Sequence, residues 1–330
     1  MSIGTDGFRP RGPWRNPHVQ TIAASSPLRR AWVRRRATDL RRRARQVLVD
    51  AGGGVRLSGR HTPRASGTLP RGLAVMLHGW EGSSESSYVL ESGARLLAEG
   101  WDVFRLNLRD HGGSHALNPA LFHSGLVDEV VAAVARIAAE HAPRPLVLLG
   151  FSLGGNFALR VALRAPAAGI ALARVLAVAP VVDPARSMRA LEDGLPVYSR
   201  YFMHQWCGSL RRKQRAFPQT RYFDSHELRL GLRELTRVLV QRHTDYGTLD
   251  NYLDAYSIAG DRLATLQVPA AILAARDDPV IPVVDFEALA ALPALRVEFT
   301  DHGGHCAFLH GLRGPSFSAL WLAARAGGMG

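Results

Sequence analysis

Three residues that lie far apart in the chain have the types and the order of a nucleophile, an acid and a base. Ser152 is the centre of a G-x-S-x-G motif, Asp278 follows an apolar run, and His305 follows two glycines. A serine hydroxyl at its ordinary pKa is a poor nucleophile and needs a general base. A histidine base in turn needs a carboxylate that fixes its tautomer. The three residues therefore predict acyl transfer through a covalent serine intermediate.

The G-x-S-x-G motif predicts a sharp turn between a strand and a helix. The apolar run Leu146–Leu149 precedes the motif, and a helical pattern follows it. On such a turn the residues two before and two after the serine crowd each other, so Gly150 and Gly154 are expected to be structural. The serine then lies at a helix N-terminus, where the helix dipole favours a developing negative charge.

Three aspartates are candidates for the acid. Asp278 lies just past the apolar run Ala270–Ala274 and four residues before a proline, and this spacing favours it over its neighbour Asp277. Asp183 is a further alternative, because it follows the apolar run Val175–Val182 and some hydrolases place their acid there. We predict that Asp278 is the acid, that Asp277 is a loop residue, and that Asp183 caps a turn.

Two histidines are candidates for the base. His305 directly follows Gly303 and Gly304, which allow the loop to fold back over the sheet and aim the imidazole at Ser152. His302 lies only two residues past an apolar run and is expected to be a loop residue. The spacing of the two histidines also fits a metal pair, but suitably spaced cysteine or carboxylate partners are missing. We therefore predict His305 as the base, and no metal site.

Backbone amides are expected to hold the oxyanion. The apolar run Leu73–Leu77 leads into His78-Gly79-Trp80, and such a strand-end H-G turn commonly supplies one amide. The residue after the nucleophile supplies the other. We therefore predict the amides of Trp80 and Leu153 as donors. Gly79 is expected to be a structural turn residue.

Elements that position these residues can be predicted from the hydrophobic pattern. Short apolar runs alternate with amphipathic helical segments from residue 73 onward, which is typical of buried parallel strands. The runs are Leu73–Leu77, Val103–Leu108, Leu146–Leu149, Val175–Val182, Ala270–Ala274 and Leu295–Phe299. A hairpin of Gln46–Asp50 and Val55–Arg60 precedes them. We predict a doubly wound α/β fold, with an eight-stranded, mostly parallel sheet and flanking helices.

The alternation is interrupted between about Ala185 and Leu266, where we expect an inserted helical cap. Its aromatic residues either form the core of the cap or line a substrate pocket: Tyr198, Tyr201, Phe202, Trp206, Phe217, Tyr222 and Phe223. The predicted organisation is a Pro- and Arg-rich extension packing on the core over 1–45, the first part of the core over 46–184, the cap over 185–266, and the second part of the core over 267–330.

Composition excludes several classes of protein. Hydrophobic residues make up 47% of the 330 residues and charged residues 21%, which is ordinary for a globular protein and excludes a disordered one. An apolar window of the roughly 18 residues that a membrane span needs is missing, as is the apolar core of a secretory signal. Two cysteines exclude a disulfide framework and fit a reducing compartment. We therefore expect a cytoplasmic location.

The net charge of +13 is concentrated near the N-terminus, because nine arginines and one aspartate fall within Arg29–Arg45. This stretch is either a solvated basic surface or an arm that touches an anionic partner. A recognisable nucleic-acid-binding module is missing, so we expect no nucleic-acid partner and at most a weak contact with an anionic surface. The pattern favours no particular oligomeric state.

Several segments together resemble the YheT-like α/β-hydrolase family of esterases. They are Asn16-Pro17-His18-Val19-Gln20-Thr21, His78–Ser84, Gly150–Asn156, Asp277-Asp278-Pro279 and His302–Phe308. The first is the most distinctive, because general hydrolases lack it. The resemblance implies an α/β-hydrolase fold, a catalytic triad of Ser152, Asp278 and His305, no cofactor, and hydrolysis of short- to medium-chain esters. Eukaryotic relatives act on lipid esters, some with acyl transfer.

The predicted function is cleavage of carboxylic esters, from small molecules or lipids, through an acyl-enzyme on Ser152. The aromatic cap favours an apolar acyl group. The alternative is an acyltransferase or a monoacylglycerol-type lipid esterase that uses the same three residues.

Overall fold

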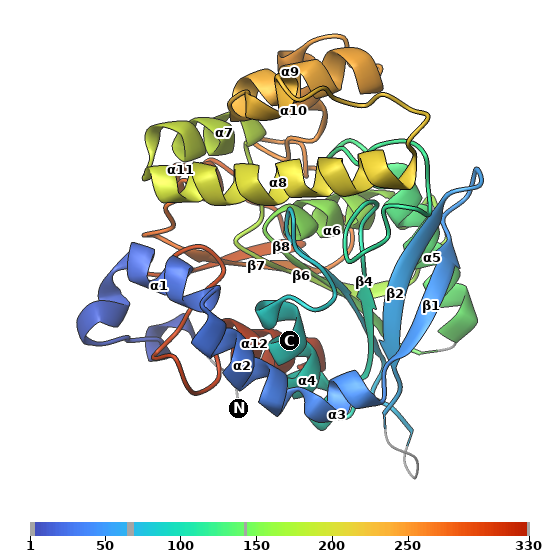
Figure 1. Ribbon diagram of the computed structural model, residues 1–330. Helices are drawn as coiled ribbons and strands as arrows, with labels where there is room; N and C mark the ends of the chain where they lie inside the picture. Colours follow the sequence, from blue (N-terminus) through green and yellow to red (C-terminus); the bar gives the residue numbers. More distant parts are fainter. Residues whose placement is uncertain (1–3, 65–68, 142–143, 329–330) are drawn as a thin grey trace.

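The computed structural model describes residues 4–64, 69–141 and 144–328, and an eight-stranded sheet forms its centre (Figure 1). Positions 1–3, 65–68, 142–143 and 329–330 of the predicted extension and core lie outside the described residues. The strands are β1 (Arg45–Asp50), β2 (Arg56–Thr62), β3 (Leu73–Leu77), β4 (Asp102–Leu106), β5 (Leu146–Phe151), β6 (Leu172–Val178), β7 (Ala270–Ala275) and β8 (Leu295–Thr300).

The strand order is β1-β2-β4-β3-β5-β6-β7-β8. All pairs from β4 to β8 are parallel, while β1 and β2 form the predicted hairpin and β2 pairs antiparallel with β4. Neighbouring parallel strands end at the same edge of the sheet. The register places Leu77 at the end of β3 opposite Gly150 near the end of β5, so the loops that follow both strands meet at that edge.

Helices cover both faces of the sheet. Alternate residues of β3 belong to two separate buried clusters, because successive strand side chains point to opposite faces. One cluster includes residues of α5 (Val127–His141) and α6 (Leu153–Arg164). The other includes residues of α4 (Ser87–Ala98) and α12 (Phe317–Gly327). The predicted α/β architecture is therefore confirmed.

The chain between β6 and β7 forms a helical cap over the carboxyl edge of the sheet (Figure 1). The cap consists of α7 (Pro184–Asp193), α8 (Pro196–Ala216), η3 (Glu227–Arg229), α9 (Leu232–His243) and α10 (Leu249–Ala255). The 21 residues of α8 give it a length of about 30 Å. This helix therefore extends across the whole site below it. The short helix α11 (Val283–Glu287) follows β7.

The N-terminal segment forms short helices along the lower left of the molecule in Figure 1: η1 (Thr5–Gly7), η2 (Gly12–Arg15), α1 (Pro17–Ala24), α2 (Pro27–Arg36) and α3 (Thr38–Arg42). Arg29 on α2 is buried and forms an ion pair of 2.6 Å with Glu91 on α4. Arg30, Arg34 and Arg35 are exposed. The basic stretch therefore contains both a buried anchor and solvated charges. Among the described helices, none is long and apolar enough to cross a bilayer.

One predicted strand boundary was wrong. The apolar run Val175–Val182 suggested a strand to residue 182, but β6 ends at Val178. Ala179 adopts a left-handed backbone with φ of 45°, and Pro180 has no amide hydrogen for a sheet ladder. The last apolar residues of the run therefore belong to the loop above the sheet, where Val181 lines a pocket.

Candidate active site

Ser152 stands on the turn between β5 and α6 in a strained conformation, with φ of 51° and ψ of −122°. A Cβ on Gly150 would lie 2.6 Å from the Gly155 Cα, and a Cβ on Gly154 would lie 2.5 Å from the carbonyl oxygen of Leu77. Real Cβ atoms do not approach so closely, so both glycines are required by the turn. A left-handed backbone at a non-glycine residue persists only when the surrounding structure enforces it.

The predicted nucleophile, base and acid meet at this turn. Ser152 Oγ lies 2.9 Å from His305 Nε2, and His305 Nδ1 lies 2.9 Å from Asp278 Oδ2. The amides of Val280 and Ile281 donate to Asp278 Oδ1 at 2.8 and 3.0 Å. Because Asp278 accepts hydrogen bonds on both oxygens, it holds the proton of His305 on Nδ1. His305 Nε2 is then free to accept the serine proton.

The alternative residues have other partners. Asp277 Oδ1 accepts a hydrogen bond of 2.9 Å from the Gly304 amide, and its Oδ2 lies 3.3 Å from His302 Nδ1. Asp183 caps α7, where Oδ1 accepts from the Arg186 amide at 3.0 Å. Among the residues described, no group of three or more His, Cys, Asp or Glu side chains is arranged to hold a metal ion.

Two opposing effects act on His305. Burial lowers the pKa of its imidazole, while the negative charge of Asp278 and the neighbouring Cys306 raise it, and the net pKa lies well above the ordinary 6.5. The hydrogen bond to Asp278 stabilises the imidazolium that forms when the serine gives up its proton. The site is therefore built to favour a charged His305.

The loop after β3 lies directly against the nucleophile. A Cβ on Gly79 would lie 3.1 Å from the Ser152 Cβ. The Gly79 amide donates to Tyr88 Oη at 3.0 Å, and the Glu81 amide donates to His111 Nε2 at 3.1 Å. The amides on either side of Trp80 are thus engaged within the protein. The Trp80 residue between them lines the same pocket as Ser152 and Leu153.

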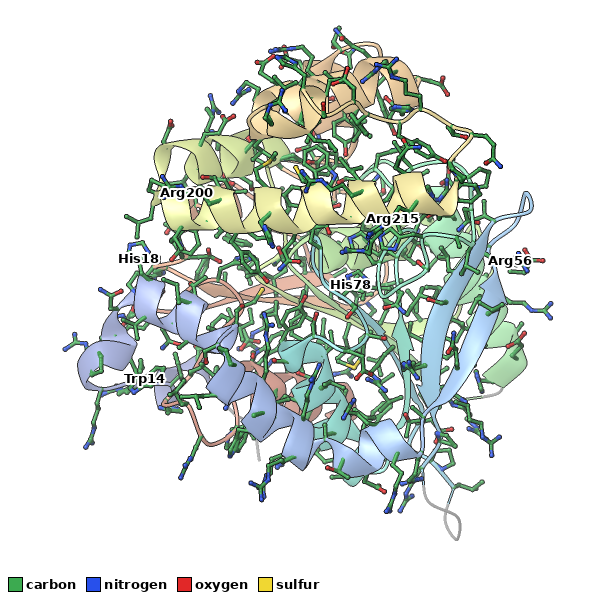
Figure 2. All side chains as sticks on the ribbon, viewed as in Figure 1. Trp14, His18, Arg56, His78, Arg200 and Arg215 are labelled. Atoms are coloured by element: carbon green, nitrogen blue, oxygen red, sulfur yellow. The ribbon has the colours of Figure 1, made fainter. Side chains whose placement is uncertain are left out.

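Two buried histidines brace this loop in their neutral form. The Leu108 amide donates to His78 Nε2 at 3.1 Å, so His78 Nδ1 donates to the Gly79 carbonyl at 2.8 Å. Figure 2 labels His78 below α8. Burial and the nearby His111 lower the pKa of His78 to about 3, and burial lowers the pKa of His111 to about 4. Neutral rings keep these hydrogen-bond directions fixed across the physiological pH range.

An inner pocket lies between Ser152 and the cap, with a volume of about 110 Å³. Its walls are mostly apolar and include Trp80, Met188, Leu191, Phe202, Trp206, Leu232, Leu239, Tyr252 and Tyr256. The indole rings of Trp80 and Trp206 meet edge to face with centroids 5.4 Å apart. This pocket is suited to an apolar group attached to a carbonyl at Ser152.

A second, larger groove of about 660 Å³ reaches Ser152 and His305 from the side of the N-terminal helices. Its walls include residues of α1 and α2 together with Tyr198 and Tyr201 of the cap. Ser152 lines both hollows, so a bound ester with its carbonyl at Ser152 has separate places for its two halves.

The seven cap aromatics divide between the two roles that the sequence left open, and Phe217 is half-buried against the hydrophobic core. Phe202 and Trp206 line the inner pocket, and Tyr198 and Tyr201 line the groove. Tyr222 and Phe223 are buried within the cap, and Tyr222 Oη donates to the Pro119 carbonyl at 2.5 Å. Those of the seven that line the pocket or the groove all belong to α8.

Sequence reasoning missed Glu81 and Lys213. Burial raises the pKa of Glu81, beside Trp80, to about 8, so this carboxyl is mostly protonated at neutral pH. Lys213 is the single lysine of the chain, and its buried Nζ lies 2.6 Å from Asp110 Oδ1. In an arginine-rich helix this lysine resembled one more surface charge. Its rarity was the only available signal.

A serine on a strand-to-helix turn, under a cap and on a mostly parallel eight-stranded sheet, is typical of the α/β hydrolases. A model of the alpha/beta hydrolase fold family matches residues 74–312. The chain belongs to this family. Within it, the chain is 27% identical to Putative esterase YheT of Escherichia coli (strain K12) over 260 residues, which cover 76% of this chain and 74% of that protein. The predicted YheT-like resemblance is thereby confirmed.

Two further comparisons agree on the fold. The chain is 25% identical to embryogenesis-associated protein EMB8 of Picea glauca over 330 residues, 93% of this chain and 68% of that protein. An esterase of Pyrococcus furiosus superposes with a TM-score of 0.54 at 15% identity, over 86% of this chain and 88% of that chain. At such low identity the structural likeness establishes the fold alone.

Proposed function

We propose that the protein is a serine esterase that cleaves carboxylic esters through an acyl-enzyme on Ser152. The observation that carries the proposal is the continuous chain of hydrogen bonds from Ser152 through His305 to Asp278, each 2.9 Å long. The esterase name of the E. coli relative supports the same activity.

In the proposed mechanism, His305 Nε2 takes the proton of Ser152 as Oγ attacks the ester carbonyl. The amides of Trp80 and Leu153 donate to the oxyanion of the tetrahedral intermediate. When the C–O bond to the alcohol breaks, His305 returns the proton to the leaving oxygen. A water molecule then loses a proton to His305 and attacks the acyl-enzyme, which releases the acid and restores Ser152.

The inner pocket is the proposed acyl site, and its size limits the chain length. An apolar cavity of about 150 Å³ holds one benzene molecule, so by proportion the pocket of 110 Å³ takes about four carbons. The larger groove then receives the alcohol. We therefore propose short-chain acyl esters as the preferred substrates, with broader tolerance for the alcohol.

Acyl transfer is the second candidate, because the groove of about 660 Å³ gives an acceptor alcohol its own route to Ser152. The two outcomes differ only in which hydroxyl attacks the acyl-enzyme. Product analysis with glycerol present separates them. Transfer is supported if the glycerol ester exceeds the free acid at low glycerol concentration, and it is excluded if only acid forms.

The test of the proposed function compares two serines of the inner pocket. Ser152→Ala removes the nucleophile, and we expect kcat on para-nitrophenyl butyrate to fall by roughly 10⁴-fold or more. Ser187→Ala is the matched control, because Ser187 lines the same pocket and its buried Oγ lacks a hydrogen-bond partner among the described residues. We expect Ser187→Ala to keep its activity. Retention of more than about a tenth of the activity by Ser152→Ala ends the assignment.

Location and surface contacts are a separate part of the proposal. Both cysteines, Cys207 and Cys306, are buried and unpaired, which supports a cytoplasmic location. The exposed arginines of α2 support a weak, salt-sensitive contact with anionic surfaces. Sedimentation with phosphatidylglycerol vesicles at two salt concentrations tests this contact. Equal binding by a variant with Arg30, Arg34 and Arg35 changed to Gln contradicts it.

A further inference from the structure

The Asn16–Thr21 segment, which the mechanism does not use, lies against the loop that carries His305. Asn16 Oδ1 caps α1 by accepting from the His18 amide at 2.9 Å, and Pro17 occupies the first helical position. Both features fix where the helix begins. The start of the helix in turn determines which side chains of α1 face the loop.

Thr21 connects α1 directly to the base. Its Oγ1 donates to the Pro17 carbonyl at 2.8 Å and accepts a hydrogen bond of 2.9 Å from the backbone amide of His305. The donated bond fixes the direction of the hydroxyl, so its lone pair points at the amide. A threonine 284 positions earlier in the chain therefore orients the peptide that carries the imidazole.

Gln20 holds the far end of the same loop. Its side chain is completely buried. Its amide group pairs with the backbone of Leu309: Oε1 accepts from the Leu309 amide at 2.7 Å, and Nε2 donates to the Leu309 carbonyl at 2.9 Å. The second Nε2 hydrogen goes to the Trp14 carbonyl at 2.7 Å. All three hydrogen bonds are directional, so Gln20 fixes the loop four residues past His305.

The helix and the loop approach so closely that a side chain between them has no room. A Cβ on Gly304 would lie 2.6 Å from both the Pro17 carbonyl oxygen and Thr21 Oγ1. Gly304 also has a left-handed φ of 54°. This glycine, which the sequence suggested only as a flexible hinge, is thus the contact point between α1 and the loop.

The loop needs such support, because its backbone is strained on the other side of His305. Cys306 and Phe308 have positive φ values of 58° and 48°, which are unfavourable for residues with a side chain. Such conformations persist only when neighbouring contacts enforce them. Thr21, Gln20 and Asp277 supply hydrogen bonds to this loop from outside it.

The same helix also contacts the cap. His18 Nδ1 lies 2.8 Å from Tyr198 Oη in the first turn of α8. Figure 2 labels His18 beside the end of α8 that carries this turn. Helix α1 therefore lies between the loop of the base and the cap that covers the substrate pocket.

From these contacts we propose that Thr21 and Gln20 are positioning residues, which hold His305 Nε2 at the distance from Ser152 that proton transfer requires. The inference rests on the proposed function. It assigns a role to the N-P-H-x-Q-T segment: α1 is a brace for the catalytic base, built into the N-terminal extension.

The test removes one hydroxyl from α1. Thr21→Val keeps the shape of the side chain, and we expect kcat on para-nitrophenyl butyrate to fall roughly 10- to 100-fold while KM stays within about twofold. Thr21→Ser restores the hydroxyl and is expected to recover most of the loss. Thr38→Val is the matched control, because Thr38 is exposed on α3 and bonds only to carbonyls of α2.

A second readout does not need turnover. The His305 Nδ1 hydrogen, which is donated to Asp278, is expected to give a downfield proton NMR signal. We expect this signal to shift or broaden in Thr21→Val and to stay at its wild-type position in Thr38→Val. If Thr21→Val has the wild-type signal and the wild-type kcat, the positioning role of Thr21 is wrong. An equal loss of kcat in Thr21→Val and Thr21→Ser also rules it out. If Thr21→Val does not fold, Thr21→Ala serves in its place.

The two proposals fail in different ways. If Ser152→Ala keeps its activity, the esterase mechanism is wrong, and the NMR comparison alone then decides whether Thr21 positions His305. If Ser152→Ala is inactive and Thr21→Val behaves as the wild type in both readouts, only the brace is wrong.

Discussion

Asp277 and Asp278 are adjacent in the chain and bind the same loop at different points. Asp278 accepts from the ring of His305 at 2.9 Å, while Asp277 accepts from the backbone amide of Gly304 at 2.9 Å. The two side chains bind consecutive residues of the loop. Asp278 orients the imidazole of His305, and Asp277 orients the peptide of Gly304 before it. The pair therefore allows orientation of the ring and support of the backbone to be separated by mutation.

Replacing the two aspartates is expected to have unequal effects. Asp278→Asn leaves the shape intact but can donate to Nδ1 and thereby favour the wrong tautomer, so we expect kcat to fall by about 10⁴-fold. Asp277→Asn keeps an acceptor for the Gly304 amide, and we expect a loss of about tenfold or less. Steady-state kinetics of both variants check this. Equal losses would contradict the assignment of the acid.

The pH dependence follows from the raised pKa of His305. The mechanism needs a neutral imidazole in the resting enzyme, and the raised pKa means that this form appears only above pH 6.5. We therefore expect kcat/KM to rise with pH along an acid limb whose midpoint lies above 6.5. Loss of the charge in Asp278→Asn lowers the pKa of His305, so the residual activity of that variant is expected to have its acid limb at lower pH.

The inner pocket predicts how acyl preference responds to its size. Met188→Trp fills the pocket, and we expect activity on four-carbon esters to fall by about tenfold or more relative to acetate. Trp206→Leu enlarges the pocket and is expected to shift the preference toward longer chains. A panel of para-nitrophenyl esters measures both. Leu195→Trp, at the exposed N-cap of α8, is the control.

The buried pair of Lys213 and Asp110 predicts a large effect on stability. Lys213 Nζ also donates to the carbonyls of Asn118 at 2.5 Å and Ala120 at 3.0 Å, so Lys213→Met leaves several buried acceptors without a donor. We expect the free energy of unfolding to fall by about 3–5 kcal/mol. Urea unfolding measures this loss. In the double variant Lys213→Met with Asp110→Asn, the unpaired charge is also removed. If its loss in free energy of unfolding equals the sum of the losses of the two single variants, the two residues are not coupled.

The local pattern of the sequence was sufficient to predict the sheet and the turn that carries Ser152. Apolar runs with helices between them determine a parallel sheet, and the glycines around Ser152 belong to one short turn whose geometry is local. The candidate acid and base could be proposed because the carboxyl ends of neighbouring parallel strands meet at one edge. Each of these inferences depends on a few consecutive residues and on a general rule of sheet topology.

Contacts between distant segments were not predictable in the same way. Thr21 is one polar residue of a short helix, and its partner His305 lies 284 positions later. Lys213 stands among arginines near the end of α8, yet its carbonyl partners come from the loop at residues 115–120. Such partners are determined by how whole elements pack, and the period of a hydrophobic pattern carries no information about them.

The distance in sequence between α1 and its partner loop also sets an order of events during synthesis. Helix α1 leaves the ribosome well before residues 304–309, which form its docking loop. At about 5–20 residues per second, the 284 intervening positions take roughly 15–60 s to translate. The nascent chain therefore carries α1 with an unfilled docking face until residues 304–309 have been made.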